Sequence, residues 1–183
     1  VAKQRPDLKL VVMSATLDVD MLRRFLPDAR TTTCDGKLHP VDVRYVERMS
    51  DASLASQVSR IVPDAIAQVD GDLLVFLPGV REIDDAADAL RGKTPADVRR
   101  LHGRLPAAEQ DAVLRRSDRQ RVILATNIAE TSLTVPGVRA VIDSGRHRSP
   151  QFDPSLGTNR LLLRWVSKAS ADQRAGRAGR LGP

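Results

Sequence analysis

The sequence has little of what a disulfide-linked, zinc-binding or membrane-spanning protein needs. Its 183 residues include one cysteine, Cys34, and three histidines, which excludes an internal disulfide and argues against a structural zinc site. No apolar run approaches the length that crosses a membrane, and no signal-peptide pattern opens the chain. We therefore expect a cytoplasmic protein that binds neither a membrane nor a metal ion of its own.

Aromatic residues are also scarce, at 3% of the chain, so extensive stacking on nucleic-acid bases is not expected. The net charge of +6 is unevenly distributed. Residues 51–90 hold two basic and eight acidic side chains, a balance of −6, whereas residues 141–183 hold eight basic and three acidic ones, a balance of +5. The basic end of the chain predicts a polyanionic partner.

The most distinctive stretch is the arginine-rich end, residues 170–180. Ser170 followed by Gln173 has the spacing of a capping box, which predicts a helix that starts at Ser170. On that helix Gln173, Arg177 and Arg180 would share one face. Two guanidinium groups and an amide aimed the same way suit an oxygen-rich anion such as a terminal phosphate.

Two glycines in the same stretch, Gly176 and Gly179, each cost roughly 1 kcal/mol inside a helix. A close approach of another backbone segment would explain their presence. The alternative interpretation is a basic helix end that is simply solvated.

The first third of the chain is predicted to form short elements. They are a buried strand at 8–13, a helix at 19–26 capped by Asp18, extended pieces at 31–33 and 41–46, and a helix at 53–69 in which Pro63 argues for a kink or break.

From residue 72 strands and helices alternate, which predicts an α/β doubly wound, mostly parallel sheet with helices on both faces. The expected strands are 72–77, 98–101, 121–125 and 138–142, the helices are 80–90 and 106–116, and a β-hairpin pairs 146–152 with 160–166. Ligands of such folds bind beyond the carboxyl ends of the strands. That rule selects the turns at 78–81, 102–104, 126–127 and 145–146. Taken singly, each is better explained as ordinary turn chemistry, and the signal lies in their occurring together.

One apparent motif is excluded. Gly92-Lys93-Thr94 resembles the end of a phosphate-binding P-loop, but that motif requires a glycine at position 87, which is alanine. The stretch also follows a helix rather than a strand. We interpret it as a helix end.

Several segments together resemble the conserved motifs of DEAH-box helicases, in the order in which that family has them. They are Ser14-Ala-Thr16, Phe76 to Ile83, Leu101 to Pro106, Thr126 to Thr134 (TNIAETSLT), and Gln173 to Arg180 (QRAGRAGR). The last two motifs are highly specific for this family. The amino-acid sequences of residues 77–83 and 178–182 are most similar to the bacterial HrpB type of the family.

This resemblance implies an ATP-dependent RNA helicase with two RecA-like domains, which bind ATP and Mg²⁺ between them and RNA across both. Residues 1–40 would be the tail of the first RecA-like domain, and residues 41–183 the second. The partners would be RNA, as a single-stranded track or a duplex substrate, and the upstream RecA-like domain of the same protein. The 146–166 hairpin would resemble a strand-separating wedge.

Site residues are implied in the same way. Gln173, Arg177 and Arg180 would be catalytic, the two arginines as fingers on the γ-phosphate, and Ser132 and Gly137 would join them in binding nucleotide. Ser14 and Thr16 would couple hydrolysis to domain movement. Six residues would contact nucleic acid: Gly79, Arg81, Gly103, Arg104, Thr126 and Asn127.

Two positions depart from the family pattern. Pro136 stands where relatives usually have an acidic residue, and Leu114 where they often stack an aromatic ring on adenine, which is consistent with tolerance of several nucleotides. The P-loop and the acidic Mg²⁺-binding box are expected upstream of Val1, so this chain alone should hydrolyse ATP negligibly. The alternatives are a non-enzymatic RNA-binding or regulatory module on the same fold and, more weakly, a double-stranded-DNA motor.

Overall fold

A computed structural model describes residues 9, 11–13, 19–32, 39–46, 52–130 and 133–179. The chain divides into two compact units, residues 1–37 and 38–183. The first unit contains helix α1, Val19–Phe25, as predicted, although its expected cap Asp18 lies outside the described residues.

The strand predicted at 8–13 is wrong for its described residues. Lys9 and residues 11–13 have no regular structure, and Val11 and Met13 are 77% and 87% exposed. A lone strand cannot bury its apolar side chains or pair its backbone groups without neighbours, and the described part of this unit contains no other strand.

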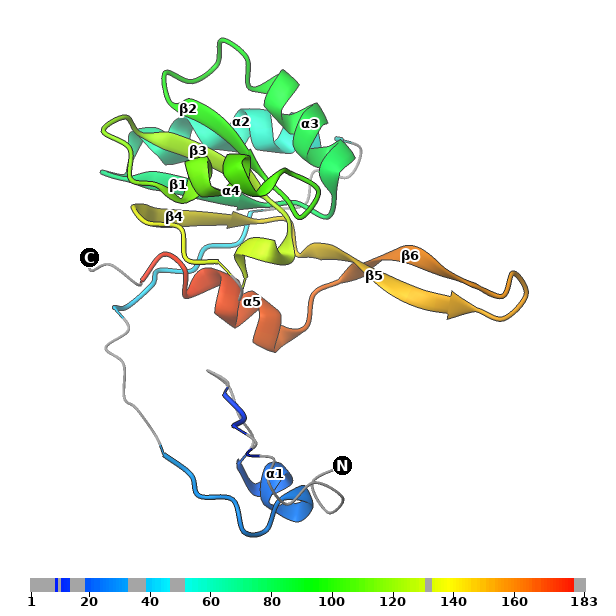
Figure 1. The fold of residues 1–183 in the computed structure, drawn as a ribbon. Helices are drawn as coiled ribbons and strands as arrows, with labels where there is room; N and C mark the ends of the chain where they lie inside the picture. The colour runs from blue at the N-terminus through cyan, green and yellow to red at the C-terminus, as the bar shows by residue number, and fades with distance from the viewer. Residues whose placement is uncertain are drawn as a thin grey trace. The chain divides into compact units, whose positions relative to one another are not determined.

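Four parallel strands form the sheet of the second unit, as Figure 1 shows. They are β1 Asp72–Phe76, β2 Asp97–Leu101, β3 Arg121–Ala125 and β4 Val138–Asp143, in the order β2-β3-β1-β4. Each lies within two residues of its predicted bounds. The chain thus crosses over β3 to reach β2, and later crosses over β1 to reach β4.

Helices cover both faces of this sheet, as predicted. Leu73 and Val75 of β1 point into a core shared with α2, Leu54–Ala67, and α3, Val80–Ala89. Leu74 and Phe76 point into a second core with α4, Ala107–Leu114, and the 3₁₀ turn η1, Asn127–Ala129. This alternation along one strand shows that β1 is buried on both faces, as the central strand of a doubly wound sheet must be.

Helix α2 is capped by Ser53, whose Oγ accepts the Ser56 N–H at 3.2 Å, and it continues past Pro63, so Pro63 does not break it. One prediction of local structure is wrong. Residues 41–46 form no strand, and Val43 and Tyr45 are 54% and 94% exposed. Their alternation of apolar and charged residues fits a strand, but none of these residues pairs with the sheet.

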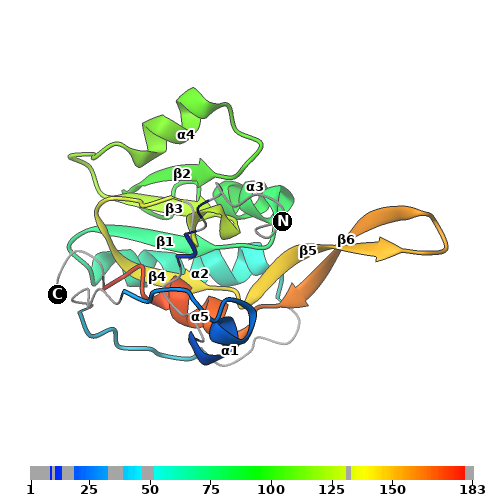
Figure 2. The same ribbon diagram turned by 60° about the horizontal axis from the view of Figure 1, so that its bottom comes forward.

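A long β-hairpin projects from the sheet, as Figures 1 and 2 show from two directions. It pairs β5, Arg146–Asp153, with β6, Thr158–Trp165, in antiparallel register from Arg146 opposite Trp165 to Asp153 opposite Thr158. Its place in the sequence agrees with the prediction. The chain then returns to the sheet as helix α5, Lys168–Ala175.

None of the helices in the described ranges combines the length and the apolar character that crossing a bilayer would require.

Candidate functional site

The carboxyl ends of the four strands lie at one edge, in register. The Leu77 N–H donates to the Ala125 carbonyl at 2.8 Å, and the Thr126 N–H donates to the Leu101 carbonyl at 3.2 Å. The connection after β1 leads to the face that holds α3, and the connection after its neighbour β3 leads to the opposite face. A crevice is therefore expected between these two loops, at the point where doubly wound folds bind ligands.

The loop after β1 holds the predicted contacts Gly79 and Arg81. A Cβ at position 79 would lie 2.1 Å from Nη1 of Arg148, so a side chain there would displace that guanidinium from its present position. Arg148, from the hairpin, forms a bidentate pair with Glu82 at 2.7 and 2.9 Å. The Arg81 side chain is 86% exposed and 3.9 Å from Asp85, so it is accessible to a ligand.

The loops after β2 and β3 hold the other four predicted nucleic-acid contacts. Gly103 and Arg104 are exposed, and the space beside Gly103 is open, with its nearest neighbour, Cδ1 of Ile128, at 4.0 Å. Asn127 is exposed and Thr126 is partly buried at the start of η1. The structure thus brings the predicted contacts to one edge of the sheet.

Helix α5 starts earlier than predicted. Its cap is Ser167, whose Oγ accepts the Ser170 N–H at 3.1 Å, and the helix ends at Ala175. The Ser170 hydroxyl instead donates to Oε1 of Glu130 at 2.6 Å. Arg177 therefore lies in a turn beyond the helix, and the argument that Gln173 and Arg177 share a helical face is wrong.

Arg177 is only 4% exposed. Its Nε donates to the Glu130 carbonyl at 2.9 Å, Nη2 donates to the same oxygen, and Nη1 donates to the Leu133 carbonyl at 2.7 Å. The segment that follows η1 thus holds the planar guanidinium in one orientation. Gln173, in the last turn of α5, is partly buried and also has interaction partners.

Arg174 was missed by the sequence reasoning and, among the residues that the structure describes, is the most buried charged side chain, 1% exposed. Its Nε donates to Oε2 of Glu130 at 2.8 Å and its Nη1 to Oδ1 of Asp143 at 2.9 Å. Its guanidinium also lies 4.8 Å from the centre of the Phe76 ring. These contacts attach α5 to β1, β4 and η1 together. The excess of basic residues drew attention to the stretch but gave no signal that one of them is buried.

The close backbone approach suggested for the glycines holds for Gly179. A Cβ there would lie 2.6 Å from the His39 carbonyl oxygen, and the Gly179 carbonyl accepts the His39 N–H at 3.1 Å. Gly176 caps the end of α5 and meets only atoms of that helix.

Several predicted residues are not brought to this edge or cannot be placed. Gly137 lies at the opposite edge, just before β4, where a Cβ would be 2.9 Å from Oδ2 of Asp72. Leu114 packs against the second core, and the Pro136 carbonyl accepts a hydrogen bond from Arg121. The remaining ones lie outside the described residues: Ser14, Thr16, Ser132 and Arg180.

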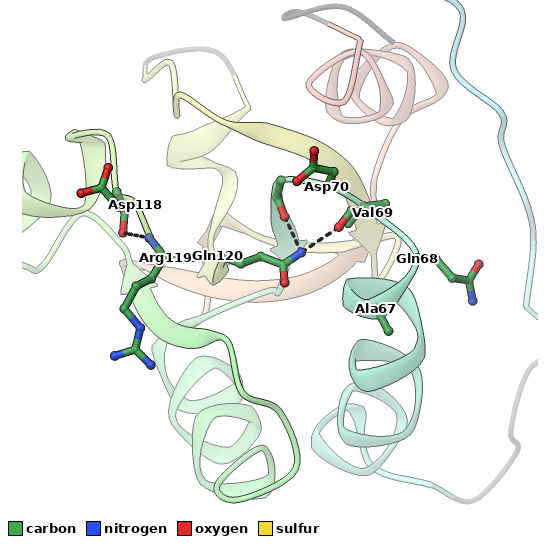
Figure 3. A pocket seen from close by; sticks show the side chains of 9 residues that line it. Ala67, Gln68, Val69, Asp70, Asp118, Arg119 and Gln120 are labelled. Atoms are coloured by element: carbon green, nitrogen blue, oxygen red, sulfur yellow. Dashed lines mark hydrogen bonds between the residues drawn. The ribbon is translucent and has the colours of Figure 1, made fainter.

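An open pocket lies at the amino ends of β1 and β3, between residues 67–71 and 117–120 (Figure 3). The Gln120 amide links the two segments that line this pocket, because it donates to the Val69 and Gly71 carbonyls at 2.8 and 2.9 Å. This pocket is at the edge opposite the predicted contacts and brings none of them together. Among the residues described, histidine, cysteine and acidic side chains form no group of three or more that could hold a metal ion.

Comparison with known proteins places these features in context. Residues 56–182 match the family model described as helicase conserved C-terminal domain. Over 98% of its own length, this chain is 42% identical to the ATP-dependent RNA helicase HrpB of Escherichia coli strain K12. It is 36% identical to the Schizosaccharomyces pombe pre-mRNA-splicing factor ATP-dependent RNA helicase prp22.

Solved structures agree. The fold matches a crystal structure of the Escherichia coli DEAH/RHA helicase HrpB with a TM-score of 0.88, over 98% of this chain. The chain spans 23% of HrpB and 16% of prp22, so these relatives contain much that has no counterpart in it.

Proposed function

The chain belongs to the helicase conserved C-terminal domain family, and on that premise we propose that it is the second RecA-like domain of an ATP-dependent RNA helicase of the DEAH type. In that role it supplies Arg177 and Arg180 to the γ-phosphate of ATP bound between two domains, together with Gln173. It also supplies half of an RNA track. Residues 1–40 would then belong to the end of the first RecA-like domain, with Ser14 and Thr16 in its coupling motif.

The observation that best supports this proposal is the position of Arg177. Its guanidinium is held by carbonyls of residues 130 and 133, and that segment continues directly from Thr126 and Asn127 at the carboxyl edge of the sheet. The arginine proposed to bind phosphate would thus be linked by one short turn to the residues proposed to contact nucleic acid. Such adjacency is what a motor needs if hydrolysis is to respond to RNA.

The RNA half of the proposal depends on the loops beyond β1, β2 and β3. Arg81, Arg104 and Asn127 are exposed there, and exposed arginine and amide groups suit contacts to phosphate oxygens, which position a strand without reading its sequence. The projecting hairpin β5–β6 stands beside the loop at 78–81 through the Arg148–Glu82 pair, where a strand-separating element would be useful. Cytoplasmic RNA is the substrate class that we propose.

ATP and Mg²⁺ would be held mainly by the first RecA-like domain. This sequence has no complete P-loop, and arginine fingers stabilise the charge of a transferred phosphoryl group only after a lysine and a metal have positioned it. We therefore expect negligible ATP hydrolysis by this chain alone, and recovery of hydrolysis when the missing domain is added in trans.

A second candidate is a non-enzymatic RNA-binding module on the same fold. The observation in its favour is that Arg177 is 4% exposed and donates to backbone carbonyls, a contact that would also serve a purely structural arginine. The two candidates differ in what the loss of this side chain does to hydrolysis.

The test is RNA-stimulated ATP hydrolysis by the full-length protein, wild type against Arg177→Ala. An arginine finger contributes on the order of 10³–10⁵ in rate, so we expect kcat to fall several hundredfold or more while RNA binding is kept. Arg91→Ala, which removes an arginine that is 78% exposed, should leave kcat unchanged. Unchanged hydrolysis by a folded Arg177→Ala protein would favour the binding module instead.

A further inference from the structure

Glu130 has more contacts to the α5 region than any other residue described above as part of the site. Its carboxylate accepts from the Ser170 hydroxyl at 2.6 Å and from Nε of Arg174 at 2.8 Å. Its carbonyl accepts from Nε and Nη2 of Arg177. One residue thus binds both the helix and the proposed finger that follows it.

On its other side Glu130 is hydrogen-bonded to the turn that holds the proposed RNA contacts. The Glu130 N–H donates to the Asn127 carbonyl at 2.9 Å, and the Ala129 N–H donates to the Thr126 carbonyl at 3.3 Å. Ala129 is fully buried in the second core. Residues 126–130 therefore form a single hydrogen-bonded turn, in which a shift of Asn127 moves the Glu130 carbonyl.

The charges around Glu130 explain why its side chain holds that carbonyl in place. Arg174, 1% exposed, needs anionic partners because a buried, unpaired guanidinium is costly. It has two, Glu130 and Asp143. The Glu130 carboxylate, 16% exposed, is therefore held against α5 by a charge-assisted hydrogen bond and by the Ser170 hydroxyl, and its own backbone is fixed with it.

From this geometry we propose that Glu130 is a positioning residue that couples RNA contact at Thr126 and Asn127 to the orientation of Arg177. This inference rests on the proposed function, since it presupposes that Arg177 acts on ATP. The Glu130 side chain does not touch the nucleotide. It sets the position of the Glu130 carbonyl, which orients the Arg177 guanidinium. RNA bound at Thr126 and Asn127, at one end of the turn, therefore changes the orientation of Arg177 at the other end.

Asp143 provides a matched control. It is the other carboxylate on Arg174, but it lies at the end of β4 and contacts Arg174 and the Gly145 N–H rather than the turn at 126–130. Removing it takes the same charge from Arg174 and leaves the connection between Asn127 and Arg177 intact. A purely structural role for the cluster predicts similar effects for the two carboxylates, whereas the coupling role separates them.

The experiment measures ATP hydrolysis by the full-length protein with and without single-stranded oligouridine RNA. For Glu130→Ala we expect the ratio of kcat with RNA to kcat without RNA to fall by roughly 2- to 30-fold, the range of mutations along a coupling connection. The dissociation constant of the RNA should change far less. For Asp143→Ala the ratio should stay as in wild type, even if this variant lowers the melting temperature as much as Glu130→Ala does.

Glu130→Gln is the conservative variant. Its amide oxygen can accept from Arg174 and its amide nitrogen can donate to the Ser170 oxygen, so it should restore most of the stimulation ratio. Equal ratios in Glu130→Ala, Asp143→Ala and wild type would overturn the coupling role, as would a Glu130→Gln protein no better than Glu130→Ala. Arg177→Ala in the same assay distinguishes failure of the proposed function from failure of this inference. If Arg177→Ala leaves kcat unchanged, the proposed function fails. If Arg177→Ala abolishes hydrolysis while Glu130→Ala leaves the stimulation ratio unchanged, only this inference fails.

Discussion

Asp72 and Arg121 form a buried ion pair whose loss should strongly destabilise the second unit. Oδ2 of Asp72 accepts from Nε and Nη2 of Arg121 at 2.9 and 2.5 Å, and Oδ1 accepts the Arg121 backbone N–H at 2.8 Å. The two side chains are 8% and 4% exposed. This pair joins the amino ends of β1 and β3, the two strands at the centre of the sheet.

The magnitude follows from what remains after Asp72→Ala. Arg121 would keep its hydrogen bonds to the carbonyls of Val113, Arg115 and Pro136, at 2.9, 2.8 and 3.1 Å, but its charge would be buried without a counter-ion. Breaking one side of a buried pair in this way costs about 3–5 kcal/mol. That is a large fraction of the roughly 5–15 kcal/mol that keeps a typical domain folded.

The assay is urea unfolding of this chain, followed by far-ultraviolet circular dichroism. The matched control is Asp97→Ala, because Asp97 is also the first residue of a strand and pairs with an arginine, Arg99, at 2.6 Å. That pair is exposed, with side chains 31% and 54% accessible. Its removal should therefore cost at most about 1 kcal/mol.

A second variant separates charge from packing. Asp72→Ala combined with Arg121→Met removes both buried charges, so it should recover part of the stability lost by Asp72→Ala alone. A loss for Asp72→Ala within about 1 kcal/mol of that for Asp97→Ala would refute the reasoning, since it would mean that the guanidinium finds adequate solvation from carbonyls and water.

Two further predictions concern the turn after α5 and the tip of the hairpin. Gly179→Ala places a methyl group 2.6 Å from the His39 carbonyl oxygen, so urea unfolding should show a free energy of unfolding lower by about 1–3 kcal/mol. The control is Gly103→Ala, which adds a methyl group beside open space and should stay within about 0.5 kcal/mol of wild type. Equal stability of the two variants would contradict the packing argument. The pKa of Asp153 lies below its ordinary value because the Ser155 hydroxyl donates to its carboxylate, followed by Arg160. A lowered carboxyl pKa stabilises the folded turn above the pKa of an unfolded aspartate and loses that contribution as the pH falls through the lowered value. Ser155→Ala should therefore move the Asp153 pKa upward in an NMR titration, and an unmoved pKa would show that the Ser155 hydroxyl is not its main cause.

Local sequence patterns alone predict the sheet, most of its helices and the hairpin. Each of the four strands is a short apolar or amphipathic run between turn residues, so local patterns are sufficient to predict the strands from residue 72 onward. Because parallel strands end at a common edge, the sequence alone predicts that the turns holding Thr126, Gly79 and Gly103 lie close together. The motif order similarly indicated the helicase family.

What needed the tertiary structure is the way α5 is held. Ser167 and Ser170 lie three residues apart and either could cap a helix, so the sequence could not choose between them. The choice depends on Glu130, forty residues away from Ser170, which accepts the hydroxyl of the second serine.

The same holds for the arginines. Nothing in the run of residues 173–180 distinguishes a buried cation from an exposed one, because burial depends on which carboxylates and carbonyls other strands bring near. Asp143 and Glu130 bury Arg174, and the carbonyls of residues 130 and 133 orient Arg177. Spacing along a chain fixes which residues are neighbours on one element, whereas contacts between distant elements decide which charge is buried and which way it points.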